Sequence, residues 1–353
     1  MSDSSKTTMS TYPGKTPGGY RNEFAFAAIK TDGSVVTWGS DASGGDSSSV
    51  SEAIDADGTP AVKQLFSTVY AFAALREDGS VVTWGDASSG GDSSSVADQL
   101  NASGASAVTQ VSSAYSAFAA LREDGSVVTW GNSDYGGDSS AVAGEIDADG
   151  SPAVTQVLSA FGAFAALRED GSVVSWGNDA LGGDSSTVAD AINADDSPVV
   201  THVSATSYAF AALREDGSVV TWGEGGRGGD SSAVADAINA DNAPPVTQVF
   251  STDSAFAALR EDGSVVTWGS SDLGGDSAAV ADAIRSDGAP AVAQVFSTKS
   301  AFAALREDGS VVTWGDDVRG GDSSAVADAI NAANSPPVPQ GFSTSRAVAA
   351  RRE

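Results

Sequence analysis

The sequence predicts an all-β fold, a seven-bladed β-propeller with about three strands and a short outer helix per repeat. Three observations predict it: a strict period, a hairpin copied at that period, and a further strand-like stretch beside each hairpin. The period is 46 residues and is marked by the tryptophans Trp38, Trp84, Trp130, Trp176, Trp222, Trp268 and Trp314. Fixed periods of this size indicate propellers, solenoids or arrays. A ring of such blades covers both faces of every sheet without a separate helix layer.

The hairpin spans residues 71–85 in its second copy, with the sequence AFAALREDGSVVTWG. Its apolar residues alternate with small or polar ones, which is the period of a strand. Asp-Gly lies between the two apolar runs and favours a two-residue turn with positive φ. Such a turn pairs Leu75 with Val82 and Ala73 with Trp84, so we expect alanine opposite the indole. Both faces are largely apolar or small, and we therefore expect the sheet to be covered on both sides.

A strand of the Ala-Val-Thr-Gln-Val-Phe-Ser type precedes every hairpin except the first. The first hairpin, residues 24–39, lacks it, while a seventh such strand follows the last hairpin at 338–343. We therefore expect strand 338–343 to pair with hairpin 24–39 and close a propeller that spans residues 23–344, because propellers commonly share one blade between the termini. Residues 1–22 are expected to form a flexible tail, with an arm that docks on a neighbour as the alternative. Residues 345–353 begin an eighth hairpin and stop before its turn.

Each tryptophan strand is followed by a Gly-Gly-Asp-Ser-Ser run and then by a Val-Ala-Asp-Ala-Ile-Asn stretch. In the fifth repeat, Asp230 or Ser231 is a suitable N-cap. Val234, Ala235 and Ile238 then fall on one helical face. The spacing leaves room for two helical turns, which we expect outside the blade along the edge where many propellers carry a fourth strand.

Residues 75–85 read Leu-Arg-Glu-Asp-Gly-Ser-Val-Val-Thr-Trp-Gly. An apolar strand, a Glu-Asp-Gly turn and a Val-x-x-Trp-Gly strand in this order resemble the repeats of the regulator of chromosome condensation family of seven-bladed propellers. The likeness covers residues 22–350, in a Gly-Gly-Asp-Ser-Ser variant of the repeat. The sequence departs from the family pattern in two places. The family's Gly-x-x-His before the apolar strand is replaced by Ser-Ala-Phe at 116–118, and its Gly-Gln-Leu-Gly after the tryptophan strand is replaced by Gly-Gly-Asp-Ser at 136–139. The resemblance implies the fold. It does not carry over exchange activity on a GTPase, because fold does not imply function.

The composition narrows the choice of partners. The formal net charge is −29 and the chain has five lysines, so nucleic acid and anionic membranes are poor partners for its surface. It has no cysteine, which excludes disulfides and cysteine-ligated metal. No apolar stretch approaches the ~20 residues that cross a bilayer. Residues 1–22 lack an apolar signal core, so the cytoplasm is the default expectation.

No constellation of residues predicts an enzyme or a cofactor site. His202 is the only histidine, and its alignment with Gln110 in the repeat predicts a polar residue on a strand surface. The Asp-Ala-Asp-Gly turns at 55–58 and 147–150 resemble the start of a calcium loop but lack its later ligands and its closing glutamate. Solvated turns are therefore the default interpretation, with calcium binding as the alternative. The Gly-Gly-Asp runs lack the lysine and the spacing of a phosphate-binding loop.

Two loops vary between the repeats, whereas the Glu-Asp-Gly-Ser turn is nearly constant. One variable loop follows the first strand of each blade and the other follows the tryptophan strand. Both are expected at the same end of an antiparallel blade, opposite the hairpin turn. Loops on a rigid scaffold usually carry recognition, and Tyr and Arg are favoured interface anchors. Neutral variation of exposed loops is the alternative explanation. The candidate rim consists of Tyr70, Tyr115, Tyr135, Phe161, Leu181, Tyr208, Arg227, Leu273, Lys299 and Arg319.

These observations predict a non-catalytic protein–protein interaction or scaffold module that binds a partner on the variable-loop face. The alternative is a structural protein that assembles with copies of itself into an array or filament through its terminal segments. The incomplete hairpin at 345–353 keeps this alternative open, because an unpaired strand can add to the edge of a neighbouring sheet.

Overall fold

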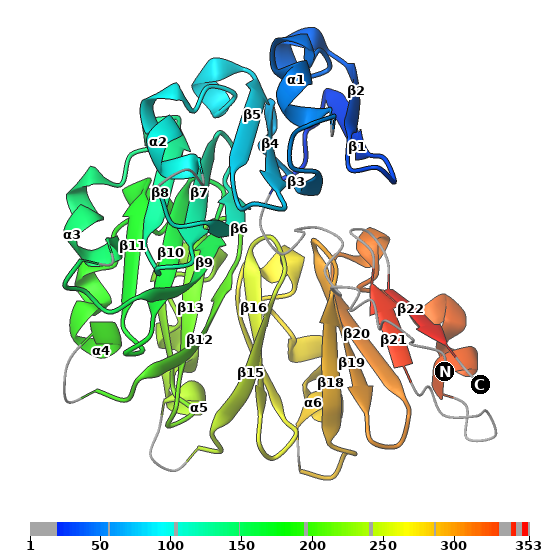
Figure 1. Cartoon of the computed structure of the whole chain (residues 1–353). Coiled ribbons are helices and arrows are strands. Elements are labelled where there is room, and N and C mark those ends of the chain that lie inside the picture. The colour runs from blue at the N-terminus through cyan, green and yellow to red at the C-terminus, as the bar shows by residue number, and fades with distance from the viewer. Residues whose placement is uncertain are drawn as a thin grey trace, which may run out of the picture.

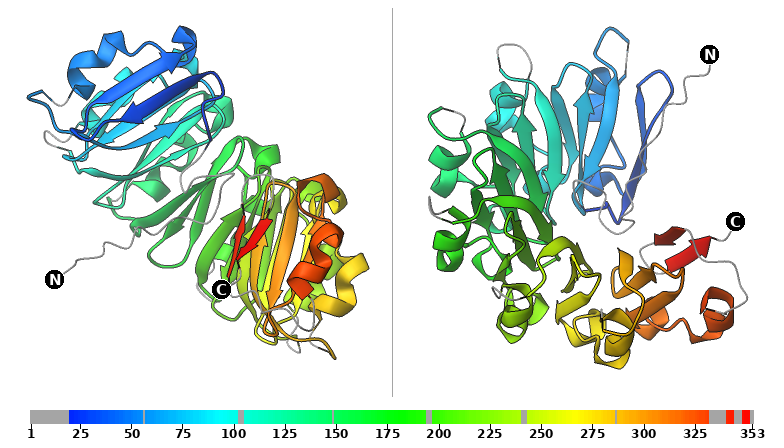
Figure 2. Two further views of the ribbon diagram at one scale, coloured as in Figure 1. Left: turned by 90° about the vertical axis from the view of Figure 1, so that its right-hand side faces the viewer. Right: turned by 90° about the horizontal axis from the view of Figure 1, so that it is seen from below.

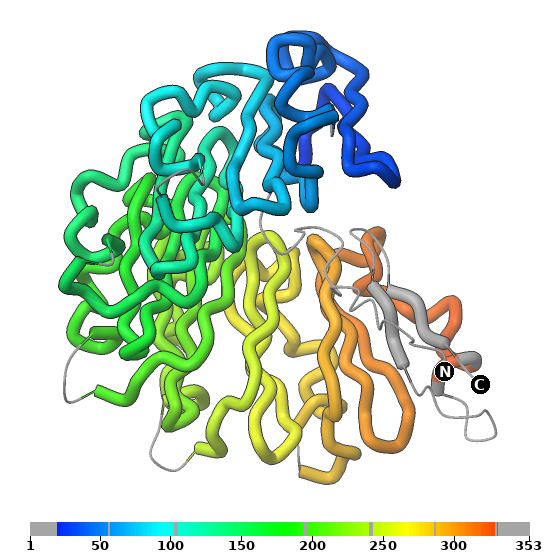
Figure 3. The backbone as a smooth tube through the Cα atoms, in the orientation of Figure 1, coloured from blue at the N-terminus to red at the C-terminus, as the bar shows by residue number. Residues whose placement is uncertain are grey.

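In the computed structural model, consecutive sheets follow one another round an arc, each beside the sheet of the preceding repeat (Figure 1). The tube in Figure 3 follows the same path from the N-terminal hairpin onward. The structure describes residues 20–351 except for 56, 102–104, 148, 194–196, 240–242, 286, 332–339 and 344–347.

Six three-stranded antiparallel sheets make up the body of the arc, each in the order of the chain. Blade 2 comprises β3 (Val62–Ser67), β4 (Ala71–Arg76) and β5 (Val81–Gly85). Blades 3 to 7 are β6 (Val108–Ser113), β7 (Ala117–Arg122) and β8 (Val127–Gly131); β9 (Val154–Ser159), β10 (Ala163–Arg168) and β11 (Val173–Gly177); β12 (Val200–Ala205), β13 (Ala209–Arg214) and β14 (Val219–Gly223); β15 (Val246–Ser251), β16 (Ala255–Arg260) and β17 (Val265–Gly269); and β18 (Val292–Ser297), β19 (Ala301–Arg306) and β20 (Val311–Gly315).

A two-stranded sheet stands at each end of this series. Blade 1 is the hairpin of β1 (Ala25–Ile29) and β2 (Val35–Gly39), and β21 (Gln340–Ser343) pairs with β22 (Val348–Arg351) beyond blade 7. Seven tryptophan hairpins and seven strands of the preceding type are thus present. They confirm the predicted all-β propeller architecture of seven repeats.

The register of the hairpin differs from the prediction by one residue. Leu75 pairs with Val81 and Phe72 with Trp84, and the equivalent pairs recur in the other blades. The predicted pairing of Ala73 with Trp84 is therefore wrong. Side chains alternate between the two faces of a strand, so a shift of the register by one residue exchanges which residues of the two strands share a face. The ring of Phe72 instead stacks on that of Trp84, with centroids 5.4 Å apart.

The cause of the slip is the turn, which has three residues instead of two. The amide of Arg76 donates to the carbonyl of Ser80 (2.9 Å), and the amide of Gly79 donates to the carbonyl of Arg76 (3.0 Å). Gly79 has a φ of 78°. A three-residue loop with a left-handed glycine in this place is the next most common hairpin connection after the two-residue turns.

Each blade has two different apolar faces, and the contact between blades joins one of each kind. The aromatic face carries the Phe and Trp of the hairpin, and the alanine face carries its small residues. Phe118 and Trp130 of blade 3 pack against Ala71 and Ala73 of blade 2, and all four are buried. The expectation that both faces are covered is confirmed in blades 2 to 7.

A hydrogen bond from the indole completes each of these contacts. In blade 2, Nε1 of Trp84 donates to the carbonyl of Gly44 in the preceding repeat at 3.0 Å. The same bond, at 3.0–3.1 Å, is made in the five following blades, from Trp130, Trp176, Trp222, Trp268 and Trp314 to Gly90, Gly136, Gly182, Gly228 and Gly274.

The outer segment of each repeat is helical, as predicted, and the helices lie along the outside of the arc (Figure 2). In the fifth repeat the carboxylate of Asp230 accepts the amide of Ser232 at 2.8 Å, and the buried side chain of Ile238 packs between blades 5 and 6. The α-helices are α1 (Ser51–Ile54), α2 (Ala97–Leu100), α3 (Ala143–Ile146), α4 (Ala189–Asn193), α5 (Ala235–Ile238), α6 (Ala281–Ile284) and α7 (Ala327–Asn331). None of the helices in the described residues is long and apolar enough to cross a membrane.

Two 3-10 turns precede each of these helices. The first follows the tryptophan strand, at Asp41–Ser43, Ala87–Ser89, Ser133–Tyr135, Asp179–Leu181, Gly225–Arg227, Ser271–Leu273 and Asp317–Arg319. The second runs directly into the helix, at Ser48–Val50, Ser94–Val96, Ser140–Val142, Ser186–Val188, Ser232–Val234, Ala278–Val280 and Ser324–Val326.

At the C-terminal end of the arc, β21 and β22 form a hairpin. β21 pairs with β22, Phe342 opposite Ala349, in the register that Phe296 and Ala303 adopt in blade 7. β22 thus occupies the position beside β21 in which the prediction places β1. The β1–β2 and β21–β22 sheets stand at the two ends of the series (Figure 1). Pairing with β22 is favoured because only a short link separates the two strands. Residues 338–339 lie outside the described residues, and closure of the ring onto hairpin 24–39 stays a prediction.

Candidate functional site: a rim of variable loops

The two variable loops of a blade lie together at one end of it. In blade 5 the guanidinium of Arg227 lies 3.9 Å from the ring centroid of Tyr208, and in blade 7 Nη1 of Arg319 donates to the hydroxyl of Ser300 at 3.1 Å. In blade 4, Leu181 packs over Gly162. The first loop therefore meets the second in these blades, as the strand order predicted.

Main-chain hydrogen bonds tie the first variable loop of each blade to that of the next. The amide of Val69 donates to the carbonyl of Tyr115 at 3.1 Å. The series runs on in the same manner from Tyr115 to Phe161, Phe161 to Ser207, Ser207 to Asp253 and Asp253 to Lys299, at 2.7–2.9 Å. Since the link uses only backbone atoms, it places no demand on the side chain. The backbone of these loops is therefore held in the same way while the side chains vary. Recognition loops have this property, and so do loops that tolerate neutral change.

Aromatic rings form an unbroken row along blades 2 to 5. Tyr70 contacts Tyr115 edge-on with centroids 5.9 Å apart, and Tyr115 contacts Phe161 at 4.6 Å. Phe161 stacks with Tyr208 at 6.0 Å. Tyr135 lies against both Tyr115 and Phe161, at 5.3 and 5.7 Å. Five of the ten predicted rim residues are thus in one aromatic cluster, and Arg227 extends it through Tyr208.

Two phenols of this row, those of Tyr70 and Tyr115, are hydrogen-bonded to each other. The hydroxyls of Tyr70 and Tyr115 lie 3.0 Å apart. This hydrogen bond to Tyr70, together with burial, raises the pKa of Tyr115 to about 12. The Tyr115 hydroxyl therefore stays protonated and uncharged at neutral pH.

Leu181 lies in blade 4 beside the aromatic row, whereas Leu273, Lys299 and Arg319 lie further round the arc, where the rim is largely polar. Lys299 and Arg319 are exposed, and Leu273 is half-buried. Nε of Arg319 lies 4.0 Å from Oδ2 of Asp316. At the boundary with the aromatic row, Nε of Arg227 lies 3.3 Å from Oε2 of Glu224. The rim therefore changes from aromatic in blades 2 to 5 to cationic and polar in blades 5 to 7.

Sequence reasoning missed two members of the aromatic cluster: Phe24, whose ring stacks on that of Tyr70 with centroids 5.3 Å apart, and Tyr20. The ring of Tyr20 lies edge-on to Tyr115 and Phe161, with centroids 6.5 and 5.9 Å apart. Asn22 holds the segment on the rim through a hydrogen bond from its Nδ2 to the carbonyl of Ser43 at 2.7 Å. The end of the expected flexible tail at 1–22 is therefore docked, while residues 1–19 lie outside the described part of the chain. For Tyr20 the only available signal was an aromatic residue just before the first hairpin.

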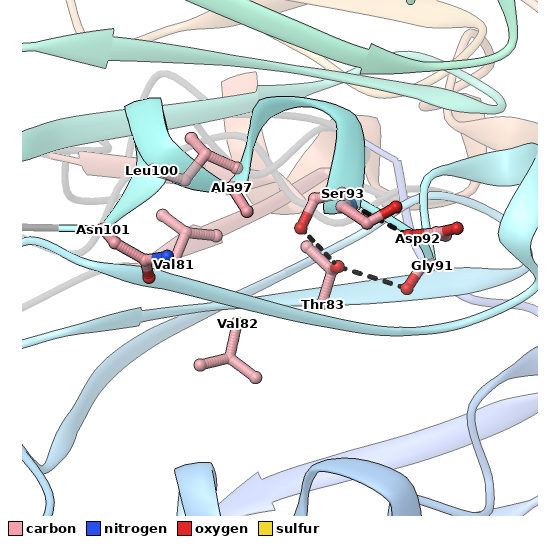
Figure 4. A pocket seen from close by; sticks show the side chains of 10 residues that line it. Val81, Val82, Thr83, Gly91, Asp92, Ser93, Ala97, Leu100 and Asn101 are labelled. Atoms are coloured by element: carbon pink, nitrogen blue, oxygen red, sulfur yellow. Dashed lines mark hydrogen bonds between the residues drawn. The ribbon is translucent and has the colours of Figure 1, made fainter.

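The hollows at the outer edge of the blades are repeated features. One is lined by Val81, Thr83, Gly91 and Leu100, and the hydroxyl of Thr83 donates to Gly91 across its floor at 3.1 Å (Figure 4). Equivalent residues line the same hollow in blades 3 and 6. A hollow that recurs in this way belongs to the blade edge and does not mark one particular site.

The other chemical predictions concern single residues. His202 is exposed on β12, the surface position that its alignment predicted. Over the residues that the structure describes, no group of three or more His, Asp and Glu side chains is placed to hold a metal ion. The residue at 56 and that at 148, inside the two Asp-Ala-Asp-Gly turns, are not among them.

Comparison with known proteins finds solved structures that resemble this chain, but no matching curated sequence. No protein-family model and no curated protein sequence matches the chain. Human WBSCR16 is 19% identical with a TM-score of 0.45, over 70% of this chain and 75% of that one. Prp20p from Saccharomyces cerevisiae is 18% identical with a TM-score of 0.42, over 74% and 72%. The ectodomain of the Arabidopsis thaliana receptor kinase ACR4 is 18% identical with a TM-score of 0.39, over 69% and 76%.

The repeat itself carries the assignment of fold. Its Glu-Asp-Gly turn, its Val-x-x-Trp-Gly strand and the three-stranded blade that they build occur together in six consecutive blades. The chain is similar in its repeat, and in the blade that the repeat forms, to the regulator of chromosome condensation-like propellers.

Proposed function

We propose that the chain is a non-catalytic protein–protein interaction or scaffold module that binds a protein partner on the rim. The observation that supports this proposal most strongly is the aromatic row that runs from Tyr70 to Tyr208 and ends under Arg227. Tyr and Arg side chains dominate the binding energy of many interfaces, and they do so when the scaffold holds them in place. Here the main-chain hydrogen bonds between blades hold the loops in place without using their side chains.

Two further points favour binding over catalysis. The hydroxyl of Tyr115 stays neutral at physiological pH, so it offers a hydrogen-bonding group and not a nucleophile. The cationic residues of the rim, Arg227, Lys299 and Arg319, stand out against a net charge of −29 and suit a partner with an acidic patch. Prp20p, a protein with the same kind of blade, is described by its binding to Gsp1p and histones, which agrees with this class of function.

The test compares variants at the two ends of the blades. Tyr208→Ala combined with Arg227→Ala removes neighbouring anchors from the rim. Glu123→Ala combined with Glu169→Ala changes exposed residues at the hairpin turns, on the opposite end. Immobilised wild-type chain and both variants are used to capture proteins from the native source, and capture is quantified by mass spectrometry. We expect the rim variant to lose a partner that the control retains, with affinity weakened at least tenfold, or about 1.4 kcal/mol. Equal capture by both variants argues against the proposal.

A second candidate function, end-to-end assembly, is favoured by the exposed face of blade 1. The side chains of Phe26 and Trp38 are 63% and 51% exposed, whereas Phe118 and Trp130, at the same positions in blade 3, are 0% and 2% exposed. In blades 2 to 7 the indole at this position donates to a glycine carbonyl of the preceding repeat, and Gly320 is the equivalent glycine of repeat 7. The carbonyl of Gly320 in a second copy is able to accept the indole of Trp38.

Light scattering at increasing protein concentration tests this second candidate. Assembly through blade 1 predicts a particle mass that rises with concentration, and Trp38→Ala should abolish the rise. The rim pair Tyr208→Ala and Arg227→Ala should leave it unchanged. A chain that stays monomeric at all concentrations excludes end-to-end assembly and leaves the rim proposal intact.

A further inference from the structure

The segment that carries Tyr20 is not part of the repeat, yet it contacts four blades. Its binding site is built from Ser67 of blade 2, Ser113 and Tyr115 of blade 3, Phe161 of blade 4 and Ser207 of blade 5. We propose that this site recognises a tyrosine side chain carried by an extended segment of a protein partner, and that Tyr20 and its flanking residues occupy it as a resident ligand. The proposal rests on the proposed function of the rim and names the class of partner.

The site first recognises the main chain of its occupant. The amide of Tyr20 donates to the hydroxyl of Ser113 at 2.9 Å, and its carbonyl accepts the hydroxyl of Ser67 at 3.1 Å. The amide of Asn22 donates to the same Ser67 hydroxyl at 2.9 Å. The Ser113 hydroxyl also donates to the carbonyl of Ser67 at 2.7 Å, which fixes its orientation. Since these bonds involve no side chain of the occupant, any extended segment is able to make them.

The site then selects a side chain by shape and by one polar group. The ring of Tyr20 meets Tyr115 and Phe161 edge-on, a geometry that aromatic pairs prefer. Burial raises the pKa of the Tyr20 hydroxyl, and the phenol is thus held in its neutral form beside Ser207. An aliphatic side chain is unable to make the edge-on ring contacts.

The rim is not the same in every repeat, which supports a specific binding site for this ring and not a feature that every repeat produces. The first variable loop carries Tyr115 and Phe161 where this ring is bound, but Asp253 and Lys299 at the same position in blades 6 and 7. A repeat that only needed to close its blades would not require aromatic residues in this part alone, because the links between blades use the backbone.

The experiment uses the full chain with Tyr20→Ala, which empties the side-chain site. The probe is a fluorescein-labelled synthetic peptide with the sequence of residues 17–24, Pro-Gly-Gly-Tyr-Arg-Asn-Glu-Phe. We expect the peptide to bind the Tyr20→Ala chain at least tenfold more tightly than the wild type, by fluorescence anisotropy. A peptide with alanine in place of its tyrosine should bind at least tenfold more weakly. Adding Phe161→Ala to the chain should remove binding, and adding Glu123→Ala should not.

A second variant covers the case in which Tyr20→Ala fails to fold, as checked by circular dichroism. Tyr20→Phe keeps the ring contacts and loses only the hydroxyl beside Ser207, so peptide affinity should rise several-fold over the wild type. Equal binding to wild type and variants, or no binding to any, overturns the inference. If the rim variants lose their natural partner while the peptide binds nothing, the proposed function stands and this inference falls. If the peptide binds but no natural partner depends on the rim, this inference stands and the proposed function falls.

Discussion

Gly90 lies directly against the ring of Phe118 in the next blade. A Cβ added to Gly90 would stand 2.6 Å from Cδ2 of Phe118, and the residue has a φ of 95°. The carbonyl of Gly90 also accepts the indole of Trp130 at 3.0 Å. The first glycine of the Gly-Gly-Asp run therefore serves the contact between blades, which explains why this glycine recurs in every repeat.

This relationship predicts that Gly90→Ala destabilises the fold. The new methyl group clashes with a buried ring, and a left-handed backbone is strained for alanine, at a cost of roughly 1–3 kcal/mol for the strain alone. Gly144→Ala is the control, because no atom lies within 4 Å of its Cβ position in α3. Urea denaturation should show a lower free energy of unfolding for Gly90→Ala only. Equal stability of the two variants would contradict the packing described for Gly90.

Trp130→Ala should be among the most costly single substitutions. It removes a side chain that is 2% exposed and breaks the indole bond to Gly90, for which we expect a loss of roughly 3–5 kcal/mol. Arg227→Ala removes a half-exposed ion pair and a cation–π contact, which together stabilise the chain by about 1 kcal/mol or less. Denaturant melts of the two variants measure the difference. Similar losses would show that the buried and exposed assignments are wrong.

Closure of the ring predicts a different behaviour for the first tryptophan. β22 holds the edge of β21 that β1 would need, so deletion of residues 345–353 should free this edge and let hairpin 24–39 pair there. Trp38 would then gain the carbonyl of Gly320 and become buried. Trp38→Ala should cost about 1 kcal/mol or less in the full chain and roughly 3 kcal/mol or more in the truncated one. The same small cost in both would exclude closure through this edge.

The hairpin turns predict a stability that decreases in acid. The hydroxyl of Ser310 donates to Asp308 and lowers the pKa of that carboxyl, and the pKa values of Asp78, Asp124, Asp170 and Asp216 are also lowered. A carboxyl with a lowered pKa in the folded state stabilises the fold above its unfolded pKa, about 3.9. That stabilisation is lost as the pH falls through the lower folded value. The melting temperature should therefore drop below about pH 4, and Asp308→Asn should show a smaller drop. A melting temperature that does not change between pH 5 and 3 would contradict this account.

The sequence carries the architecture but not all of its details. The tryptophan period and the alternation of apolar residues in 71–85 suffice to predict the blades, because the same pattern recurs in each repeat. The register was not predictable from Asp78-Gly79, since this dipeptide suits both two- and three-residue loops and only the cross-strand partners distinguish them. The stacking of Phe72 on Trp84 follows from that register and was missed with it.

The site was predictable in part for a similar reason. The variable loops stand out by comparison between repeats, so the rings from Tyr70 to Tyr208 could be named as one surface. Tyr20 has no counterpart in the other repeats and therefore no such comparison. The pairing of β21 with β22 was equally hidden, because β1 and β22 both match the strand that follows β21 in the repeat.

Site-specific photo-crosslinking tests the central claim, that the rim binds a protein partner, most directly. A photoreactive amino acid is placed at Lys299 or Arg319, which are exposed on the rim, and at Glu123 or Glu215 at the hairpin turns. The labelled chains are irradiated in extract of the native source, and crosslinked proteins are identified by mass spectrometry. We expect a common protein crosslinked from both rim positions and from neither turn position. Crosslinks from the turn positions alone, or equal yields from both ends of the blades, would contradict the claim.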